Sequence, residues 1–421
     1  MPQKGADSVA IIELGSAKTC CLVAAVDAEG DPQITGVGHL GSAGIEQGLV
    51  QDLSKAQTIL SRVVQQAETM AGHVIEQAVV VTSGGHLGND GIRVEVSAAG
   101  HAIERGDIIK TIRLAEREAD AGPGTLLHAV PACFSIDGKS GVRNPEGLLG
   151  ERLSLDICVQ AIENGHAGNL HNLANQAMLD VPALLFSGYA SAQACLHDEE
   201  KENGVACVDL GGGICSTTIF CGSKLIYGGA DPMGSDRITR TLAKRLSLSV
   251  TDADRLKKQH GRVWQRDADF KEVISVPQRL VEGGMEQTDI RKARLISLIR
   301  PDVEEILESV AAQLKRAGFS GRDAGPVVLT GGGAQLQGLN LLAEQILGCP
   351  VRLGFPQRYA GLPTSMRGPA FSSMIGALSH ILTGEREELS SVSGRLKKGA
   401  TLTGPAPIWP KRVLKWLRDA W

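Results

Sequence analysis

The chain has 421 residues, of which 43% are hydrophobic and 21% are charged, a balance typical of a globular protein with two or three domains. Its formal net charge of −4 excludes a general nucleic-acid binder, which would carry a broad basic excess. None of its nine cysteines stands in a C-x-x-C pair, and no stretch reaches the ~20 apolar residues that span a membrane. We therefore expect free thiols and a cytosolic chain that does not cross a membrane.

The first half of the chain predicts an α/β domain with an insertion. Its periodicity predicts strands at 9–14, 19–27, 34–39 and 79–81 and a helix at 54–71. This pattern of strands and helices is interrupted between about 84 and 161. A helix at 108–121 and strand-like runs at 126–135 and 153–162 there indicate an inserted subdomain. After it we expect a helix at 170–179, a strand at 182–186, a helix at 189–196 and a charged, solvent-exposed loop at 197–203.

The opening of the chain then repeats itself. Val205 to Phe220 follows the plan of Val9 to Val23: an apolar strand ends in carboxylate-Leu-Gly, turns through small residues and enters another apolar strand. A third strand is expected at 225–227, as one followed the first copy. An internal repeat of this kind predicts two related lobes, each with one glycine hairpin.

The second half continues with helices and a further glycine motif. Helices are expected at 238–246, 252–260, 291–317, 339–347 and 371–382, with a polar, poorly periodic region at 261–289. A strand at 326–329 leads into Thr330-Gly-Gly-Gly-Ala334. Residues 385–407, rich in Gly, Ser, Thr and charge, are typical of a flexible linker.

The glycine motifs predict a phosphate-binding site. The backbone N–H groups of the turns at Gly15-Ser16 and at Gly211, Gly212 and Gly213 can approach phosphate oxygens, because the glycines in these turns have no Cβ to block them. The carboxylates that precede these turns, Glu13 and Asp209, can hold Mg²⁺ through water. Gly331, Gly332 and Gly333 can pack flat against an adenine or ribose. Each motif alone is often an ordinary turn, but the three in this order favour one nucleotide site.

These motifs resemble those of the actin, sugar-kinase and heat-shock-chaperone ATPase superfamily, whose two-lobe α/β fold is ribonuclease H-like. The resemblance implies that ATP and Mg²⁺ bind at Glu13-Leu-Gly-Ser-Ala-Lys18, Asp209-Leu-Gly-Gly-Gly213 and Leu329-Thr-Gly-Gly-Gly-Ala334. It also implies that Gly234 lines the nucleotide and that 187–196 and 374–381 are connecting helices.

Two departures from that superfamily bear on activity. Glu13 stands where most members have Asp, and Ser187 stands where the chaperone ATPases carry a water-orienting glutamate. We therefore expect ATP binding with at most weak hydrolysis, and we assign no catalytic residue. The alternative, in which Ser187 is a small residue at a packed helix start, stays open.

The last residues predict a membrane-binding amphipathic helix. At 100° per residue, Val413, Ala420 and the other apolar residues of 409–421 fall within an arc of about 160°, opposite the charged residues. Three of the four tryptophans lie here, and tryptophan favours the bilayer interface while cations favour anionic lipids. The expected membrane residues are Ile408, Trp409, Lys411, Arg412, Val413, Leu414, Lys415, Trp416, Leu417, Arg418 and Trp421. The alternative is a helix that docks on protein.

So short a helix predicts weak, reversible membrane binding. Firm attachment would therefore need several tails on one self-associated assembly.

Two further stretches resemble signatures of the FtsA family of bacterial actin-like cell-division proteins: Gly48-Leu-Val-Gln-Asp52 and Asn144-Pro-Glu-Gly-Leu-Leu-Gly-Glu-Arg152. That resemblance implies a peripheral protein on the cytoplasmic face of the inner membrane at the division site. It would tether FtsZ filaments, bind itself and recruit later division proteins. A pilus-assembly actin-like ATPase and a sugar or acid kinase remain as alternatives.

The resemblance also implies a division into subdomains. Subdomain 1A would comprise 1–84, 163–204 and the last helix at 363–384, and subdomain 1C the insertion at 85–162. Subdomain 2A would comprise 205–236 and 291–362, and subdomain 2B, at 237–290, would bind the FtsZ peptide. The linker at 385–407 and the membrane-targeting helix at 408–421 complete the chain.

Overall fold

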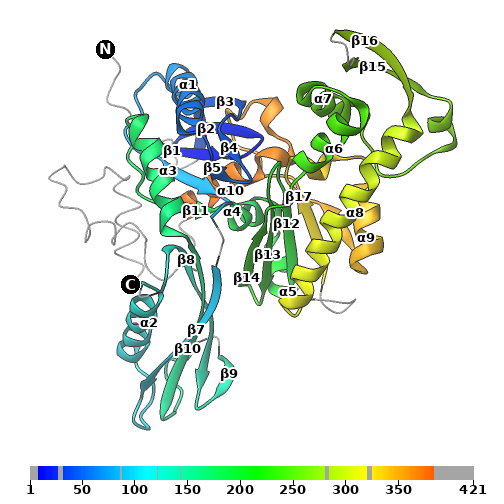
Figure 1. The fold of residues 1–421 in the computed structure, drawn as a ribbon. Helices are drawn as coiled ribbons and strands as arrows, with labels where there is room; N and C mark the ends of the chain where they lie inside the picture. The colour runs from blue at the N-terminus through cyan, green and yellow to red at the C-terminus, as the bar shows by residue number, and fades with distance from the viewer. Residues whose placement is uncertain are drawn as a thin grey trace.

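The computed structural model describes residues 8–26, 32–85, 88–120, 122–142, 144–279, 284–319 and 325–383. The linker expected at 385–407 and the amphipathic helix expected at 408–421 lie outside these residues. The described chain forms two five-stranded sheets and a four-stranded sheet that projects at the lower left of Figure 1. None of the described helices is long and apolar enough to span a bilayer.

The first sheet has the strand order β11-β6-β1-β2-β3. Its strands are β1 (Ser8–Leu14), β2 (Lys18–Val26), β3 (Pro32–Gly41), β6 (Val79–Thr82) and β11 (Leu184–Phe186). The four residues of β6 are buried, as expected for a central strand covered on both faces. The two-residue strands β4 (Ile45–Glu46) and β5 (Leu49–Val50) pair with each other beside this sheet.

Helix α1 (Leu53–Ala71) covers this sheet, and its ends follow from the sequence. The Asp52 carboxylate accepts a hydrogen bond from Lys55 N at 3.1 Å, which caps the first turn. The helix ends at Gly72, whose φ of +77° favours glycine. Gly38 in β3 lets α1 approach closely, because a Cβ there would overlap the Val63 carbonyl oxygen. Helix α3 (Asn164–Gln176), which begins and ends earlier than predicted, packs against α1.

The second sheet repeats the first, strand for strand. Its order is β18-β17-β12-β13-β14, formed by β12 (Val205–Leu210), β13 (Cys215–Cys221), β14 (Lys224–Asp231), β17 (Val327–Thr330) and β18 (Val351–Leu353). In both sheets three neighbouring strands are parallel and a hairpin is added at one side. The register also matches, since Glu13 lies opposite Cys20 and Asp209 opposite Ser216. The predicted repeat is therefore confirmed in the backbone.

The projecting sheet forms the inserted part of the first lobe. Its order is β7-β10-β8-β9, with strands β7 (Gly88–Ser97), β8 (Thr125–Ile136), β9 (Lys139–Val142) and β10 (Arg152–Ile162), and helix α2 (Arg105–Asp120) packs on it. The prediction found α2, β8 and β10 but missed β7 and β9. The insertion leaves and re-enters the lobe at one place, because Glu163 N donates to Gly85 O at 3.1 Å.

The second lobe is completed by helices and one hairpin. The helices are α6 (Asp236–Leu246), α7 (Val250–His260), α8 (Lys292–Arg316) and α9 (Leu339–Leu347), and the hairpin pairs β15 (Val273–Arg279) with β16 (Met285–Arg291). Short 3₁₀ helices lie at Asp267–Phe270, Gly332–Gln335, Thr364–Met366 and Pro369–Phe371. The hairpin occupies the region predicted to be irregular. The alternation of polar and apolar residues in this hairpin is weak, because only a few of its residues, Val276 among them, are buried.

The charged stretch after Cys195 contains a helix, α5 (Asp198–Asn203), so the prediction of a loop was wrong, while most of the stretch is solvent-exposed as predicted. Glu200 caps the helix by accepting a hydrogen bond from His197 N at 2.9 Å. Lys201 is buried, with its ammonium bonded to Gln193 and 5.6 Å from the centre of the Phe220 ring. The nine cysteines are free thiols, as expected, and all are buried except Cys133 and Cys221.

Two helices join the lobes. Helix α4 (Ser187–Cys195) follows β11 of the first sheet, and α10 (Ser372–Thr383) follows the second lobe in the chain. They pack against each other, and α4 lies between the two sheets (Figure 1). A Cβ on Gly376 of α10 would overlap the Ala190 carbonyl oxygen, so glycine allows the helices to cross in backbone contact.

Candidate nucleotide-binding site

The turns after β1 and β12 have the same hydrogen bonding. Gly15 N donates to Lys18 O at 3.1 Å, and Gly211 N donates to Ile214 O at 2.9 Å. In each case the bond closes the turn directly after a strand that ends in a carboxylate and a leucine. The sequence repeat therefore produces two copies of one hairpin, each with its backbone exposed by glycine.

The two hairpins face each other across the lobes. A Cβ built on Gly212 would lie 2.7 Å from Ala17 Cβ, and one on Gly213 would overlap Ser16 Oγ. Ser16 Oγ in turn accepts a hydrogen bond from Gly48 N at 2.9 Å. The stretch from Gly48 to Asp52 thus supports the first hairpin at one end and caps α1 at the other.

The third glycine motif lies beside the second hairpin. Gly331, with φ +87°, lies so close to Asp209 that a Cβ would overlap the carboxylate, and a Cβ on Gly333 would overlap the Leu210 side chain. A Cβ built on Gly332 would make an ordinary van der Waals contact with Ala370 Cβ, at 3.7 Å. Gly234 lies against the Gly212 carbonyl oxygen. All the glycines predicted from the motifs therefore gather around the two facing turns.

The carboxylate of the first hairpin is neutralised by its own turn. Glu13 forms an ion pair with Lys18 and accepts a hydrogen bond from Ser373 Oγ at 2.7 Å. Lys18 Nζ also lies 4.9 Å from the centre of the Phe371 ring. Burial lowers the pKa of Lys18, but the Glu13 carboxylate outweighs this and raises it above its ordinary value. Lys18 therefore carries a full positive charge at the site.

The carboxylate of the second hairpin has a different environment. Burial raises the pKa of Asp209 from 3.8 to about 6, and the negative charge of Glu13 adds to this rise. The hydrogen bond that Ser191 Oγ donates to Asp209 and the positive charge of Lys18 act in the opposite direction. Asp209 is thus a partly buried acid whose charge is incompletely compensated, and an added cation would stabilise its charged form.

Polar side chains from the two connecting helices complete the site, and sequence reasoning missed them. Ser191 on α4 and Ser373 on α10 hold the two carboxylates, and Ser372 Oγ lies 2.7 Å from Thr330 Oγ1, just before the third glycine motif. The available signal was the presence of serines within two otherwise apolar helices. Ser187 is the first residue of α4 and is 7% exposed.

The two carboxylates of the site are the kind of ligand that Mg²⁺ prefers in proteins. The negative charge of Glu13 disfavours the ionised form of Asp209, so a nearby cation would stabilise the Asp209 carboxylate. In the part of the chain that the structure describes, no three His, Cys, Asp or Glu side chains gather to bind a metal directly. Coordination through water, with phosphates in the remaining positions, fits two carboxylates.

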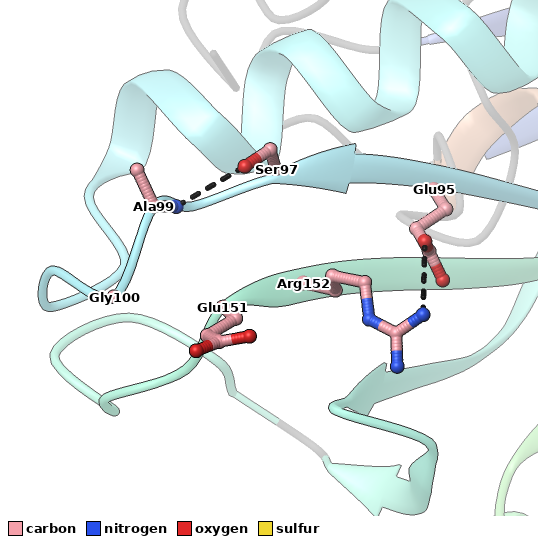
Figure 2. Close-up of a pocket in the computed structure, with 6 residues that line it drawn as sticks. All are labelled: Glu95, Ser97, Ala99, Gly100, Glu151 and Arg152. Carbon is pink, nitrogen blue, oxygen red and sulfur yellow. Dashed lines mark hydrogen bonds and ion pairs between the residues drawn. The ribbon is translucent and has the colours of Figure 1, made fainter.

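An open pocket of about 520 Å³ lies elsewhere, at the end of the inserted sheet (Figure 2). It is lined by Glu95, Ser97, Ala99, Gly100, Glu151 and Arg152. Figure 2 shows Arg152 reaching towards Glu95, and their charged atoms are 3.7 Å apart. None of the glycine motifs lines this pocket, so we assign the nucleotide site from the facing hairpins.

Comparisons with family models and known sequences agree with one another. The model described as "Cell division protein FtsA" matches residues 206–376, and the model described as "SHS2 domain inserted in FTSA" matches residues 84–160. The cell division protein FtsA of Rhizobium meliloti (strain 1021) is 32% identical over 430 residues, which cover 100% of this chain and 96% of the relative. The Escherichia coli (strain K12) FtsA is 28% identical over 414 residues, which cover 97% and 96% of the two chains.

Solved structures share the fold. A chain of the PilM-PilN type IV pilus biogenesis complex has a TM-score of 0.59 at 16% identity, covering 88% of this chain and 98% of that one. MreB5 of Spiroplasma citri bound to ADP has a TM-score of 0.53 at 11% identity, covering 93% and 99%. These likenesses, with the duplicated sheets, confirm the predicted actin-like two-lobe architecture with an inserted subdomain.

Proposed function

Because this chain belongs to the FtsA family of actin-like cell-division proteins, we propose that it binds ATP with Mg²⁺ between its lobes and links FtsZ filaments to the cytoplasmic membrane. The single observation that carries the nucleotide proposal is the pair of facing glycine hairpins, Gly15–Lys18 and Gly211–Ile214, each preceded by a carboxylate. MreB5 of Spiroplasma citri, which has the same fold, has been solved bound to ADP and to AMPPNP.

Each motif has a defined role in this proposal. The backbone N–H groups of the two turns bind the phosphates, while Asp209 and Glu13 hold Mg²⁺ through water. Mg²⁺ neutralises phosphate charge when bound. Lys18, charged and paired with Glu13 in the structure, is placed to exchange this partner for a phosphate oxygen. Gly331 to Gly333 receive the adenosine, and Gly234 lines it from the second lobe.

Hydrolysis in this proposal is weak, because α4 begins with Ser187 and the helix itself carries no Asp or Glu. Bound nucleotide then acts mainly by holding the two lobes in one relative position. The FtsA relatives do not favour the pilus-assembly or kinase alternatives. PilM shares the fold at 16% identity, which carries no functional argument.

The remaining parts of the proposal concern the membrane and the partners. We assign subdomain 1A to 1–84, 163–204 and 363–384, 1C to 85–162, 2A to 205–236 and 291–362, and 2B to 237–290. Residues 408–421 form a peripheral anchor on the inner membrane, and subdomain 2B receives the FtsZ peptide. Self-association multiplies weak anchors into a firm attachment. Later division proteins join the same assembly at the division site.

Two measurements test this function. The first is co-sedimentation of the full chain with FtsZ filaments, where we expect the protein to pellet with FtsZ and to stay in the supernatant without it. The second is flotation with liposomes that contain anionic lipid, using the full chain and a chain truncated after residue 407. We expect only the full chain to float. Equal flotation of both would refute the anchor, and an unchanged supernatant with FtsZ would refute the tether.

A further inference from the structure

The two connecting helices carry hydroxyl groups to the two carboxylates of the site. Ser191, in the middle of α4, is fully buried and its Oγ donates to Asp209 Oδ2. Ser373, in the first turn of α10, is 3% exposed and its Oγ donates to Glu13 Oε1 at 2.7 Å. Two buried serines on different helices therefore each hold one acid of the proposed Mg²⁺ site.

The arrangement is crossed between the lobes. Helix α4 follows β11 of the first sheet but packs against β12 and β13, and its serine holds the acid of the second lobe. Helix α10 follows the second lobe in the chain but packs against β1, and its serine holds the acid of the first lobe. The orientation of each carboxylate therefore depends on an element that arrives from the opposite lobe.

The crossing itself is tightly defined. Gly376 of α10 lies in backbone contact with Ala190, the residue before Ser191. Polar contacts also link the two helices to the third glycine motif. Cys195 Sγ at the end of α4 lies 3.5 Å from Thr330 Oγ1 and 3.3 Å from Ser372 Oγ at the start of α10. A change in the angle between α4 and α10 would therefore move both serine hydroxyls relative to the strands that carry the acids.

We propose that Ser191 and Ser373 are positioning residues that hold Asp209 and Glu13 in the orientation required by the cation of a bound Mg²⁺–nucleotide. This rests on the nucleotide binding proposed above. A hydroxyl that donates to one oxygen of a carboxylate fixes its rotation and favours its ionised form. For Asp209 this leaves Oδ1 beside Gly331, and for Glu13 it leaves Oε2, the oxygen that is paired with Lys18 Nζ. Asp209 Oδ1, and Glu13 Oε2 once Lys18 has exchanged it for a phosphate oxygen, are the oxygens that would face the hydrated cation.

The test separates binding of the cation from binding of the nucleotide. We would measure the affinity for ATP in Mg²⁺ and in EDTA for the wild-type chain, Ser191→Ala and Ser373→Ala. The Mg²⁺-dependent gain in affinity should fall roughly tenfold in each variant, the factor expected for losing a hydrogen bond to a charged group. The affinity in EDTA should change little. Ser191→Cys, which keeps a donor at this position but a weaker one, should give an intermediate loss.

Ser379→Ala is the matched control. Ser379 is buried further along α10, away from the carboxylates, and its hydroxyl interacts with Tyr359. The control should keep the whole Mg²⁺-dependent gain. Equal losses in Mg²⁺ and EDTA for Ser191→Ala and Ser373→Ala would mean a merely structural role and would overturn the proposal, as would a full gain in both variants.

A nucleotide-free measurement keeps this inference distinct from the function on which it rests. In a double-mutant cycle of Ser191→Ala and Asp209→Asn, followed by thermal unfolding in EDTA, the two changes should be clearly non-additive. Non-additivity together with no ATP binding by the wild-type chain would show the contact to be real and the nucleotide function to be wrong, which also removes the cation role. Strict additivity with normal ATP binding would overturn the positioning role alone.

Discussion

The two glycine hairpins share a backbone but differ in electrostatics. In the first, Glu13 is paired with Lys18 of the same turn and held by Ser373. In the second, Asp209 is held by Ser191 and its pKa is raised to about 6 by burial. Duplication has thus kept the geometry of the turn while the charges have diverged. The first hairpin is balanced without a ligand, whereas the second gains stability when a cation arrives.

The largest effect that separates the hairpins should come from Asp209→Asn in EDTA. The folded chain holds the Asp209 proton more tightly than the unfolded chain, so stability falls as the pH rises from 3.8 towards about 6. A pKa raised from 3.8 to about 6 corresponds to roughly 3 kcal/mol of destabilisation of the charged form in the folded chain. Asp209→Asn should therefore be more stable than the wild type at pH 7 by that order, with the difference vanishing near pH 4.

Urea unfolding between pH 4 and pH 7 measures this difference. Glu118→Gln provides a matched carboxylate-to-amide control, because Glu118 is exposed on α2, and it should leave the pH profile unchanged. If Asp209→Asn has the same stability as the wild type at pH 7, the ionised Asp209 carboxylate does not destabilise the folded chain.

The next effect should come from breaking the contact between the hairpins. A Cβ at Gly213 would overlap Ser16 Oγ and lie 2.9 Å from the Gln47 backbone. Gly213→Ala should therefore cost about 2 kcal/mol of stability, since overpacking forces backbone shifts, and it should weaken ATP binding more than tenfold. Calorimetric titration and thermal unfolding measure the two effects.

Gly168→Ala is the control for this substitution, because Gly168 lies within α3 with open space around its Cβ position. It should be neutral or stabilising, since alanine favours the helix. Normal ATP affinity in Gly213→Ala would contradict the facing-hairpin site.

A smaller effect, of opposite sign to that of Asp209→Asn, is expected for Glu13→Gln. The substitution leaves the largely buried Lys18 ammonium without its partner, which should lower stability by roughly 1 to 2 kcal/mol. Adding Lys18→Met to Glu13→Gln should recover part of the loss. If Glu13→Gln were instead stabilising, the charge of Glu13 would be incompletely compensated, as that of Asp209 is, and the two hairpins would have the same electrostatics.

The smallest effect should come from the ion pair at the rim of the two lobes. Arg240 of α6 and Glu46 of the first lobe lie 3.5 Å apart, with side chains 59% and 66% exposed. Glu46→Ala should change stability by less than about 0.5 kcal/mol, because exposed ion pairs contribute little. A larger loss in thermal unfolding would mean that the rim, rather than the hairpins, holds the lobes together.

Local chemistry explains which features were predictable. The hairpins were found because glycine, a preceding carboxylate and an apolar strand lie within a few adjacent residues, and the repeat of Val9 to Val23 at Val205 to Phe220 doubled the signal. Helix α5 was missed because its charges resembled a loop, although Glu200 caps it. The hairpin β15–β16 was missed because a largely exposed strand pair shows little alternation of polar and apolar residues.

The supports of the site could not be read from the sequence. Ser373 lies 360 residues from Glu13, and nothing near either residue indicates that they meet. Ser191 lies 18 residues from Asp209, but the contact depends on how α4 crosses between the sheets. Such contacts are products of the tertiary fold, so a motif predicts the acids while only the fold predicts the hydroxyls that orient them.

The joint at the base of the inserted sheet has a consequence for folding. Glu163 N and Gly85 O are hydrogen-bonded at 3.1 Å, and Gly88 of β7 pairs with Ala161 of β10 just beyond them. Once β7 and β10 have paired, the two ends of the insertion are already held together. The rest of the first lobe then pays the loop-closure entropy of a short hairpin rather than that of the whole insertion. The insertion can therefore fold as a unit. It then brings together strands of the first lobe that lie far apart in the chain, which should speed the folding of that lobe.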